Sequence, residues 1–443
     1  MLNLYQEIAT NEKNHPYVAV KQLLPNGLTK DTYKSFVKAE YQTLDILRYF
    51  ETQHLIKATA FYKKKAGEAE DLYFVFPWAE HGNLRQFWKE KIPSLDDNNY
   101  MKWVFDQLVG LADAIRTLHH ESDQTCRHGD LKPENVLCFN ASRSTTVKDH
   151  TSCILVIADV GLARIHDKST EFRSKTRILA GETMAYAAPE IELFPERATS
   201  RRYDIWSLGC LYLEFVIWLL YGIEELERFN KEIGARFYTI SGPETLRVDG
   251  TKDAQVNPVV KNWIGYIKRD WRCVGTGVKD TAIGHLIALV EERLLIVTAN
   301  PDPKDQIPTL NKAEDQDQAT ANSEQSRDIN PGIVVQRPTA LSDDARKSEI
   351  SRRFERTKKY ERAYALEVFE GVLAIIQDVE KGSIEWINIH QNGVEIVIRN
   401  GPESVTGVST ASRRNSAGKN QEVSAISFYG QVRVSNNLLQ YVS

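Results

Sequence analysis

The spacing of apolar residues predicts that the chain opens with strands and one helix. Residues 17–24, YVAVKQLL, are β-branched and apolar around a single lysine, which is typical of a strand. Residues 36–50, FVKAEYQTLDILRYF, place apolar side chains at helical intervals. Residues 72–78, LYFVFPW, form an apolar run that Pro77 interrupts, so we expect a buried strand there.

Helical patterns dominate the rest of the chain. One helix is expected from Arg85 and another over residues 101–120, MKWVFDQLVGLADAIRTLHH. Residues 136–139 and 153–159 are short apolar runs, which predict two strands on either side of a polar loop. Residues 203–297 again have a predominantly helical pattern.

Two later segments have a different composition. Residues 300–347 are rich in Asp, Gln, Asn, Ser and Pro and poor in aromatic residues, so we expect them to be disordered. Helical periodicity returns over residues 360–382. Beyond it, Asn392-Gly393 lies between alternating apolar residues, which predicts a β-hairpin.

The most apolar run, LGCLYLEFVIWLLYG at residues 208–222, is too short for a membrane span and contains Glu214. A buried core helix is therefore expected.

A hydrophobic content of 42% and a charged content of 26% are those of a soluble globular protein. The net charge of -4 argues against nucleic acid or an acidic membrane surface as a partner.

The cysteines also bear on the location of the protein. All 5 are scattered and none forms a C-x-x-C pair, a pattern typical of free thiols in a reducing compartment. The first residues, MLNLYQEIATNEK, show no basic region followed by an apolar stretch, so no secretory signal is visible. We expect an intracellular protein, cytoplasmic or nuclear.

The segment HGDLKPEN, residues 128–135, contains groups that phosphoryl transfer to a hydroxyl requires. Such a transfer needs an acceptor for the hydroxyl proton, a cation on the phosphate and oxygen ligands for Mg²⁺. Asp130 can accept the proton, Lys132 can neutralise the phosphate, and Asn135 can ligate the metal. Secondary structure does not demand polar residues at this spacing, which favours the functional interpretation.

Three residues elsewhere complete this chemistry. Asp159 ends an apolar strand and precedes Val-Gly, so it can supply a second metal ligand. Lys21 can hold the α- and β-phosphates of ATP from its strand, and Glu40 on the following helix can orient that lysine.

Together these motifs resemble those of a eukaryotic-type protein kinase domain of the serine/threonine type. The matches, in chain order, are VAVK at 18–21, Glu40, HGD at 128–130, DVG at 159–161, APE at 188–190 and DIWSLG at 204–209. The resemblance covers about residues 17–297 and 360–379, and the insertion between them resembles kinase-like proteins of filamentous fungi.

The resemblance implies an α+β, bilobal protein kinase-like fold. It has a small, incomplete β-rich N-lobe, a larger helical C-lobe, a disordered insertion and a tail containing a β-hairpin. The expected boundaries are 1–78 for the N-lobe, 79–299 for the C-lobe, 300–357 for the insertion, 358–381 for the last C-lobe helices and 382–443 for the tail.

It also implies an enzyme that transfers the γ-phosphate of ATP to protein hydroxyls with Mg²⁺ as cofactor. Asp130 would act as the base and Lys132 as the phosphate clamp, with Asn135 and Asp159 as metal ligands. The residues that would bind ATP are Lys21, Glu40, Phe76, Trp78, Ala79 and Leu137. Arg362 would be the buried partner of Glu190.

His-Gly-Asp is also typical of aminoglycoside- and choline-kinase-like phosphotransferases, so Gly129 alone leaves the substrate class open. The flanking residues favour a protein substrate. KPE at 132–134 resembles serine/threonine protein kinases, and APE preceded by TMAY at 183–186 resembles the segment on which protein substrates lie.

The sequence departs from the family at three places, one of which is Val160, where the family has phenylalanine. Gly129 replaces an arginine that pairs with a phosphorylated activation-loop residue in the family, so we expect phosphorylation of this loop to matter little. No glycine precedes Lys21, where the family has a glycine-rich loop over the phosphates. We expect either a truncated start or a partial nucleotide lid that weakens ATP binding. The alternative to an active kinase is a pseudokinase or scaffold with impaired turnover.

Overall fold

The fold is given by a computed structural model of the chain. The described residues are 3–7, 17–23, 29–66, 69–120, 127–141, 153–160, 183–194, 200–240, 253–275, 279–297, 361–389 and 401–402. The expected disordered insertion at 300–357 and the expected hairpin at Asn392-Gly393 lie outside these residues.

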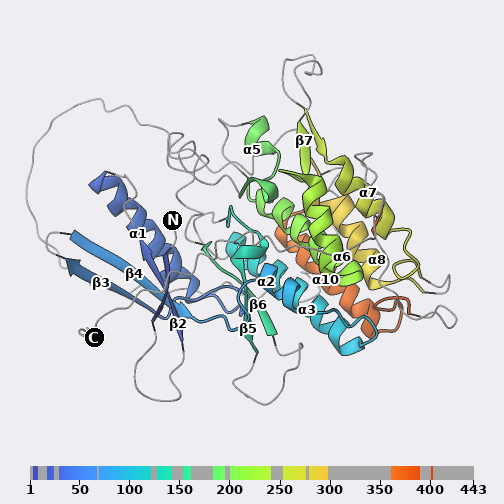
Figure 1. The fold of residues 1–443 in the computed structure, drawn as a ribbon, viewed down its shortest axis with the longest axis horizontal. Helices are drawn as coiled ribbons and strands as arrows, with labels where there is room; N and C mark the ends of the chain where they lie inside the picture. Colours follow the sequence, from blue (N-terminus) through green and yellow to red (C-terminus); the bar gives the residue numbers. More distant parts are fainter. Residues whose placement is uncertain are drawn as a thin grey trace, which may run out of the picture.

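The small lobe is an antiparallel sheet with one long helix beside it (Figure 1). Its strands are β1 (Asn3–Glu7), β2 (Val18–Leu23), β3 (Ala60–Ala66) and β4 (Ala69–Pro77), in the spatial order β1-β2-β4-β3. Helix α1 (Lys30–Leu47) turns its apolar stripe inward, so that side chains such as Leu44 and Leu47 are buried.

The larger lobe is mainly helical (Figure 1). Its helices are α2 (Leu84–Glu90), α3 (Asn98–His120), α5 (Glu190–Leu193), α6 (Arg202–Ile233), α7 (Pro258–Ile267), α8 (Ala282–Leu289) and α10 (Ala365–Glu380). Its shorter helical elements are η1 (Pro133–Asn135), η5 (Thr183–Tyr186) and η7 (Val290–Leu294). It also contains two strand pairs: β5 (Val136–Asn140) pairs with β6 (Cys153–Ile157), and β7 (Tyr238–Ile240) pairs with β8 (Ala254–Val256). The bilobal α+β fold expected from the motifs is confirmed.

Helix α6 forms the centre of the larger lobe. By sequence alone, the apolar run at 208–222 is too short for a membrane span, but the helix that contains it is long and apolar enough for one. Its most apolar stretch is nevertheless 94% buried inside the protein. The expected core helix is therefore confirmed. At Gly222 the backbone leaves the helical conformation with a φ of 82°, which glycine adopts without strain, and this kink redirects the second half of α6.

The residues after the insertion complete the larger lobe. Arg362 forms a two-pronged ion pair with Glu190, with Nη1 2.7 Å from Oε1 and Nη2 3.1 Å from Oε2, as expected. Helix α10 lies beside α3 (Figure 1). Beyond α10, Trp386 is buried with its ring 5.0 Å from that of Phe105 on α3, so the first residues of the tail pack into the helical lobe.

Four strands were not predicted from the sequence. Strand β1 precedes the lysine strand and pairs with it in antiparallel register, with Leu4 opposite Lys21. Strand β3 contains three consecutive lysines and has no clear alternation, and β7 and β8 are only three residues each. Such short or strongly polar segments carry little periodic signal, so their pairing depends on the sheet that receives them.

Candidate active site

The two lobes meet around an ion-paired lysine. Lys21 Nζ lies 2.8 Å from Glu40 Oε1 on α1 and 2.7 Å from Asp159 Oδ1, just after β6. All three side chains are at least 86% shielded, with exposures of 12%, 1% and 14%. Residues far apart in the chain are therefore brought together as the sequence analysis expected.

Electrostatics favour the charged forms of Lys21 and Asp159. Burial by itself would raise the pKa of Asp159, but the nearby Lys21 ammonium and its hydrogen bond hold that pKa below the ordinary value. Burial would likewise lower the pKa of Lys21, and the charges of Glu40 and Asp159 raise it instead. The site therefore presents a fixed cation beside an ionised carboxylate.

The HGDLKPEN segment places three polar side chains within hydrogen-bonding distance of one another. Lys132 Nζ lies 3.1 Å from Asp130 Oδ2, and Asn135 Nδ2 donates to the same oxygen at 3.0 Å and to the Asp130 carbonyl at 2.8 Å. Burial raises the pKa of Asp130, and Lys132 opposes that rise. A carboxylate that is partly desolvated in this way is a better proton acceptor than one in water.

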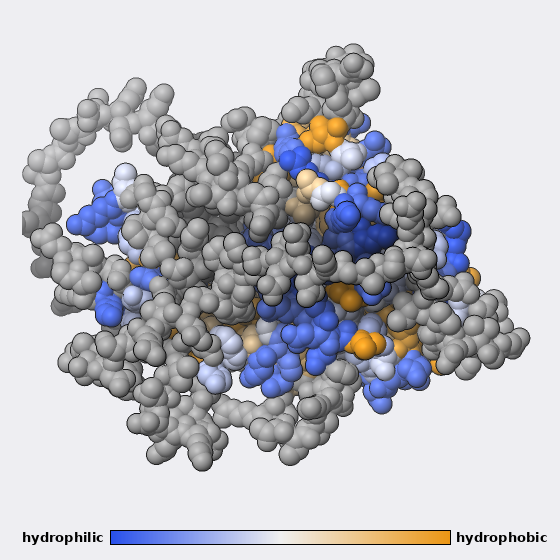
Figure 2. Space-filling view, viewed as in Figure 1, coloured by the Kyte–Doolittle hydropathy of each residue, from blue (hydrophilic) through white to orange (hydrophobic). Residues whose placement is uncertain are grey.

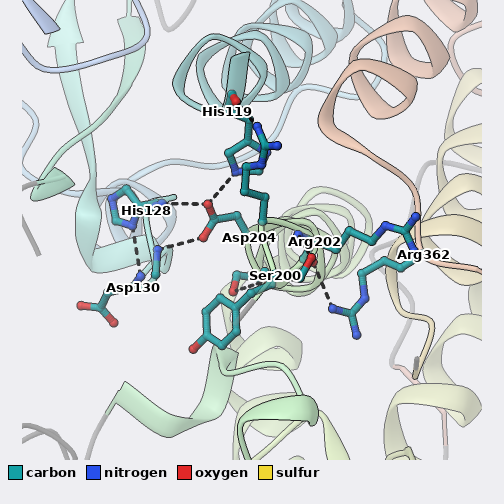
Figure 3. Close-up of polar contacts among 11 residues, drawn as sticks. His119, His128, Asp130, Ser200, Arg202, Asp204 and Arg362 are labelled. Atoms are coloured by element: carbon teal, nitrogen blue, oxygen red, sulfur yellow. Dashed lines mark hydrogen bonds and ion pairs between the residues drawn. The ribbon is translucent and has the colours of Figure 1, made fainter. Parts of the chain in front are cut away.

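Asp204 at the start of α6 lies beside this segment and holds its backbone (Figure 3). Its Oδ2 accepts from the His128 N–H at 2.7 Å, and its Oδ1 accepts from the Gly129 N–H at 2.8 Å. His119 Nε2 lies 2.8 Å from Oδ2 as well. Burial alone would raise the pKa of Asp204, and these donors lower it, so an ionised carboxylate anchors the loop.

His128 connects the loop to the strand that carries Asp159. Its Nε2 lies 2.8 Å from the Ala158 carbonyl, and its Nδ1 lies 3.2 Å from the Asp130 amide. A carbonyl can only accept, so Nε2 carries the proton and Nδ1 accepts from the amide. Asp159 itself has a φ of 61°, an uncommon conformation for a residue with a side chain, and the pairing with Lys21 stabilises it.

Gly129 has a φ of 78°, in the left-handed region that favours glycine. In the sequence analysis, Gly129 was notable because the family has an arginine at this position. The structure adds a conformational reason for glycine, because a side chain would be strained at this φ. Sequence inspection alone could not reveal this, since the turn depends on the two amides that Asp204 holds.

A second polar cluster lies next to the HGDLKPEN segment. Arg85 on α2 contacts Glu134 Oε1 at 3.0 Å through Nε and Glu214 Oε1 at 3.2 Å through Nη1. Tyr186 donates its hydroxyl to Glu214 Oε2 at 2.6 Å. Burial raises the pKa of Glu214, which has no exposed surface, and the Arg85 charge opposes that rise. The cluster connects α2, α6 and the residues just before the APE motif to the HGDLKPEN segment.

The four remaining residues expected at the nucleotide site lie where the lobes join. Phe76 is on β4 opposite Ala19, and Trp78 and Ala79 follow directly in the connecting segment. Leu137 on β5 is bridged to Asn83 at the end of that segment. All four predicted side chains are partly buried, so each retains surface toward the junction.

The oxygen ligands at the site suit Mg²⁺ held together with phosphate. Asp159 is ionised, and Asn135 uses its amide nitrogen on Asp130, so its amide oxygen is the atom that a metal would take. Among the described residues, no three His, Cys, Asp or Glu side chains form a metal-binding group by themselves. Mg²⁺ is commonly bound by one or two protein oxygens together with water and substrate phosphates, which this donor set fits.

Two contributors to the site were not foreseen. His119 lies near the end of the helix predicted over residues 101–120, and its ring supports Asp204. Arg85 was noted only as the start of a helix, and no local pattern marks it as the partner of Glu214, which is 129 positions away. The activation-loop residues 161–182 and the Thr183 side chain lie outside the described part of the chain.

A bilobal α+β fold with this ion-paired lysine and the HGDLKPEN segment is the arrangement of a protein kinase-like fold. The comparison with known families makes it specific: residues 7–253, more than half of the chain, match the model described as "Protein kinase domain". The chain belongs to the protein kinase domain family.

Curated relatives agree with this family. The chain is 31% identical over 180 residues to "Extracellular signal-regulated kinase 1" of Dictyostelium discoideum, covering 40% of this chain and 30% of the relative. It is 27% identical over 201 residues to "Lectin-domain containing receptor kinase VI.3" of Arabidopsis thaliana, with shares of 45% and 25%. For "Mitogen-activated protein kinase mpk-1" of Caenorhabditis elegans, identity is 25% over 201 residues, with shares of 45% and 39%. The matched part spans less than two fifths of each of these relatives.

Proposed function

We propose that this chain is an ATP- and Mg²⁺-dependent serine/threonine protein kinase that transfers the γ-phosphate of ATP to protein hydroxyls. The observation that carries the proposal is the joint placement of two assemblies. One is Lys21 with Glu40 and Asp159, and the other is Asp130 with Lys132 and Asn135. A scaffold protein with a kinase fold would not need all six of these side chains, nor the hydrogen bonds and ion pairs that hold them together.

Each group has a role that its environment supports. Asp130 accepts the proton of the substrate hydroxyl, because its raised pKa makes it a competent base while Lys132 keeps it ionised. Lys132 then neutralises charge on the transferring phosphate. Lys21 binds the phosphates of ATP, and Glu40 fixes its direction through a buried contact of 2.8 Å.

Asn135 and Asp159 are the residues that would hold Mg²⁺. When bound, the ion would supply positive charge to the phosphate oxygens. Asp159 is already turned toward the phosphate-binding lysine, at 2.7 Å. The protein residues thus contribute orientation, a proton acceptor and two fixed cations.

The proposed substrate is a protein. The residue patterns KPE at 132–134 and APE at 188–190 support this proposal. Ala188 and Glu190 are buried, and Glu190 forms an ion pair with Arg362.

We also propose an intracellular location. The buried free thiols of Cys138, Cys153, Cys210 and Cys273 support it.

The test is phosphate transfer from Mg-ATP to a generic protein substrate, measured for the wild-type chain and for Asp130→Asn. The expected result is a loss of at least about 100-fold in kcat, because the proton acceptor is removed while the size of the side chain is kept. Asp106→Asn is the matched control, since Asp106 lies on the exposed side of α3, 3.3 Å from Lys102. Equal rates for wild type and Asp130→Asn would refute the proposal and leave the pseudokinase interpretation.

A further inference from the structure

A short segment of the C-terminal region lies against the outer face of the larger lobe, away from the ion-paired site. The Gly401 N–H donates to Glu225 Oε2 at 2.9 Å, and Arg228 Nη1 donates to the Pro402 carbonyl at 2.8 Å. Glu225 and Arg228 lie on the part of α6 that follows the kink at Gly222. A dipeptide is therefore held by its backbone at both ends.

The side chains that hold it are themselves fixed. Arg228 is bound to Glu225 Oε2 through Nε at 2.8 Å and Nη2 at 2.6 Å, and to Glu232 Oε1 through Nη1 at 3.0 Å. Its guanidinium also lies 5.0 Å from the centre of the Trp263 ring on α7. A guanidinium held by two carboxylates and an aromatic face loses little freedom when it takes a further acceptor.

The site has room for glycine alone at its first position. A Cβ atom on Gly401 would lie 2.1 Å from Trp263 Cη2, 2.4 Å from Arg228 Nη2 and 2.6 Å from Glu225 Oε2. Trp263 cannot yield easily, because it is fully buried and its ring lies 5.7 Å from that of Phe229. Any larger residue would have to displace the core or leave the site.

The second position suits proline. Pro402 is buried, and proline has no N–H that would need a partner there. Its restricted φ also lowers the entropy that is lost when the segment is ordered. The chain contains two Gly-Pro-Glu sequences, at 242–244 and 401–403, and the second supplies the dipeptide in this site.

We propose that Glu225, Arg228 and Trp263 form a peptide-binding site for a glycine–proline dipeptide, and that the site holds the chain's own Gly401-Pro402. The site thereby fixes the point on the larger lobe from which residues 403–443 begin. Because the occupant is part of the same chain, its effective concentration is high, and an external Gly-Pro peptide competes poorly until the internal one is released. This proposal does not depend on phosphotransferase activity.

The test uses a fluorescently labelled peptide of residues 398–406, IRNGPESVT, and binding is followed by anisotropy. It is titrated with the full chain as wild type, as Gly401→Ala and as Gly242→Ala. The Gly401→Ala chain, whose own segment no longer fits, should bind the peptide at least about tenfold more tightly than the other two. Gly242→Ala is the matched control because it alters the other Gly-Pro sequence.

Two further measurements make the outcome decisive. A peptide with alanine in place of its glycine should not bind the Gly401→Ala chain, and thermal unfolding should show that this chain is folded. The proposal is overturned if the labelled peptide binds wild type and Gly401→Ala equally. It is also overturned if the peptide fails to bind a folded Gly401→Ala chain, or if the alanine peptide binds as well as the glycine peptide.

Discussion

Arg85→Ala tests how strongly the arginine cluster stabilises the site. The substitution removes the cation that lies 3.2 Å from Glu214 Oε1 and 3.0 Å from Glu134 Oε1. Glu134 is 44% exposed, so its share of the loss is at most about 1 kcal/mol. Glu214 is fully buried, and it would be left as a charge without its cation, with the Tyr186 hydroxyl still donating to it.

The size of the loss follows from the burial of Glu214. Burial already raises the pKa of this carboxyl, and removing Arg85 takes away the charge that opposes that rise. Removing one partner of a buried ion pair costs about 3 to 5 kcal/mol, and we expect a loss of that size.

The sign of the pH dependence is fixed by linkage. In the variant, the folded-state pKa of Glu214 lies further above its unfolded value than in wild type, because the opposing Arg85 charge is gone. A raised folded-state pKa favours folding more as the pH falls toward it, so the loss relative to wild type should shrink between pH 7 and pH 6.

The assay is urea unfolding of both chains at pH 7 and pH 6. Lys89→Ala on the same helix is the control, because its contact with Glu227 is 3.9 Å long and both side chains are exposed, so a loss below about 0.5 kcal/mol is expected. Arg85→Ala combined with Glu214→Gln should recover much of the stability, since no buried charge remains. A loss below about 1 kcal/mol, or one that does not change with pH, would contradict the argument.

Two further predictions concern the catalytic segment. Gly129→Ala should lower the unfolding free energy by about 1 to 2 kcal/mol in a denaturant titration, because alanine is strained at a φ of 78°, and an unchanged value would contradict the assigned conformation. Lys132→Met should move the acidic limb of the kcat/KM pH profile to higher pH, because Lys132 opposes the burial that raises the pKa of Asp130. A limb that stays in place, or moves to lower pH, would show that Asp130 is not the titrating base.

Among the described residues, hydrophilic ones prevail on the face in Figure 2, and hydrophobic ones occur there in small, separate spots over the helical lobe. The long apolar helix α6 contributes to the interior, not to this surface.

Much of the fold and of the chemistry could be read from residues close together in sequence. The HGDLKPEN segment, the lysine strand and the apolar α6 each carry a local pattern, because a loop motif, a β-branched run and a helical stripe are set by near neighbours. The order of the motifs then identified the family. Strands β1 and β3 escaped prediction because short polar strands are stabilised by pairing, which local periodicity does not encode.

Other properties were decided only when distant segments met. Lys21 and Asp159 are 138 positions apart, Arg85 and Glu214 are 129 apart, and Gly401 lies 176 positions from Glu225. The pKa directions at Asp159 and Glu214 depend on burial and on charges from other elements, which a sequence does not show. The sequence by itself determined which chemical groups are present and which fold family holds them. The tertiary structure decided which groups are buried, which are paired, and which backbone conformation favours a glycine beside the proposed catalytic aspartate.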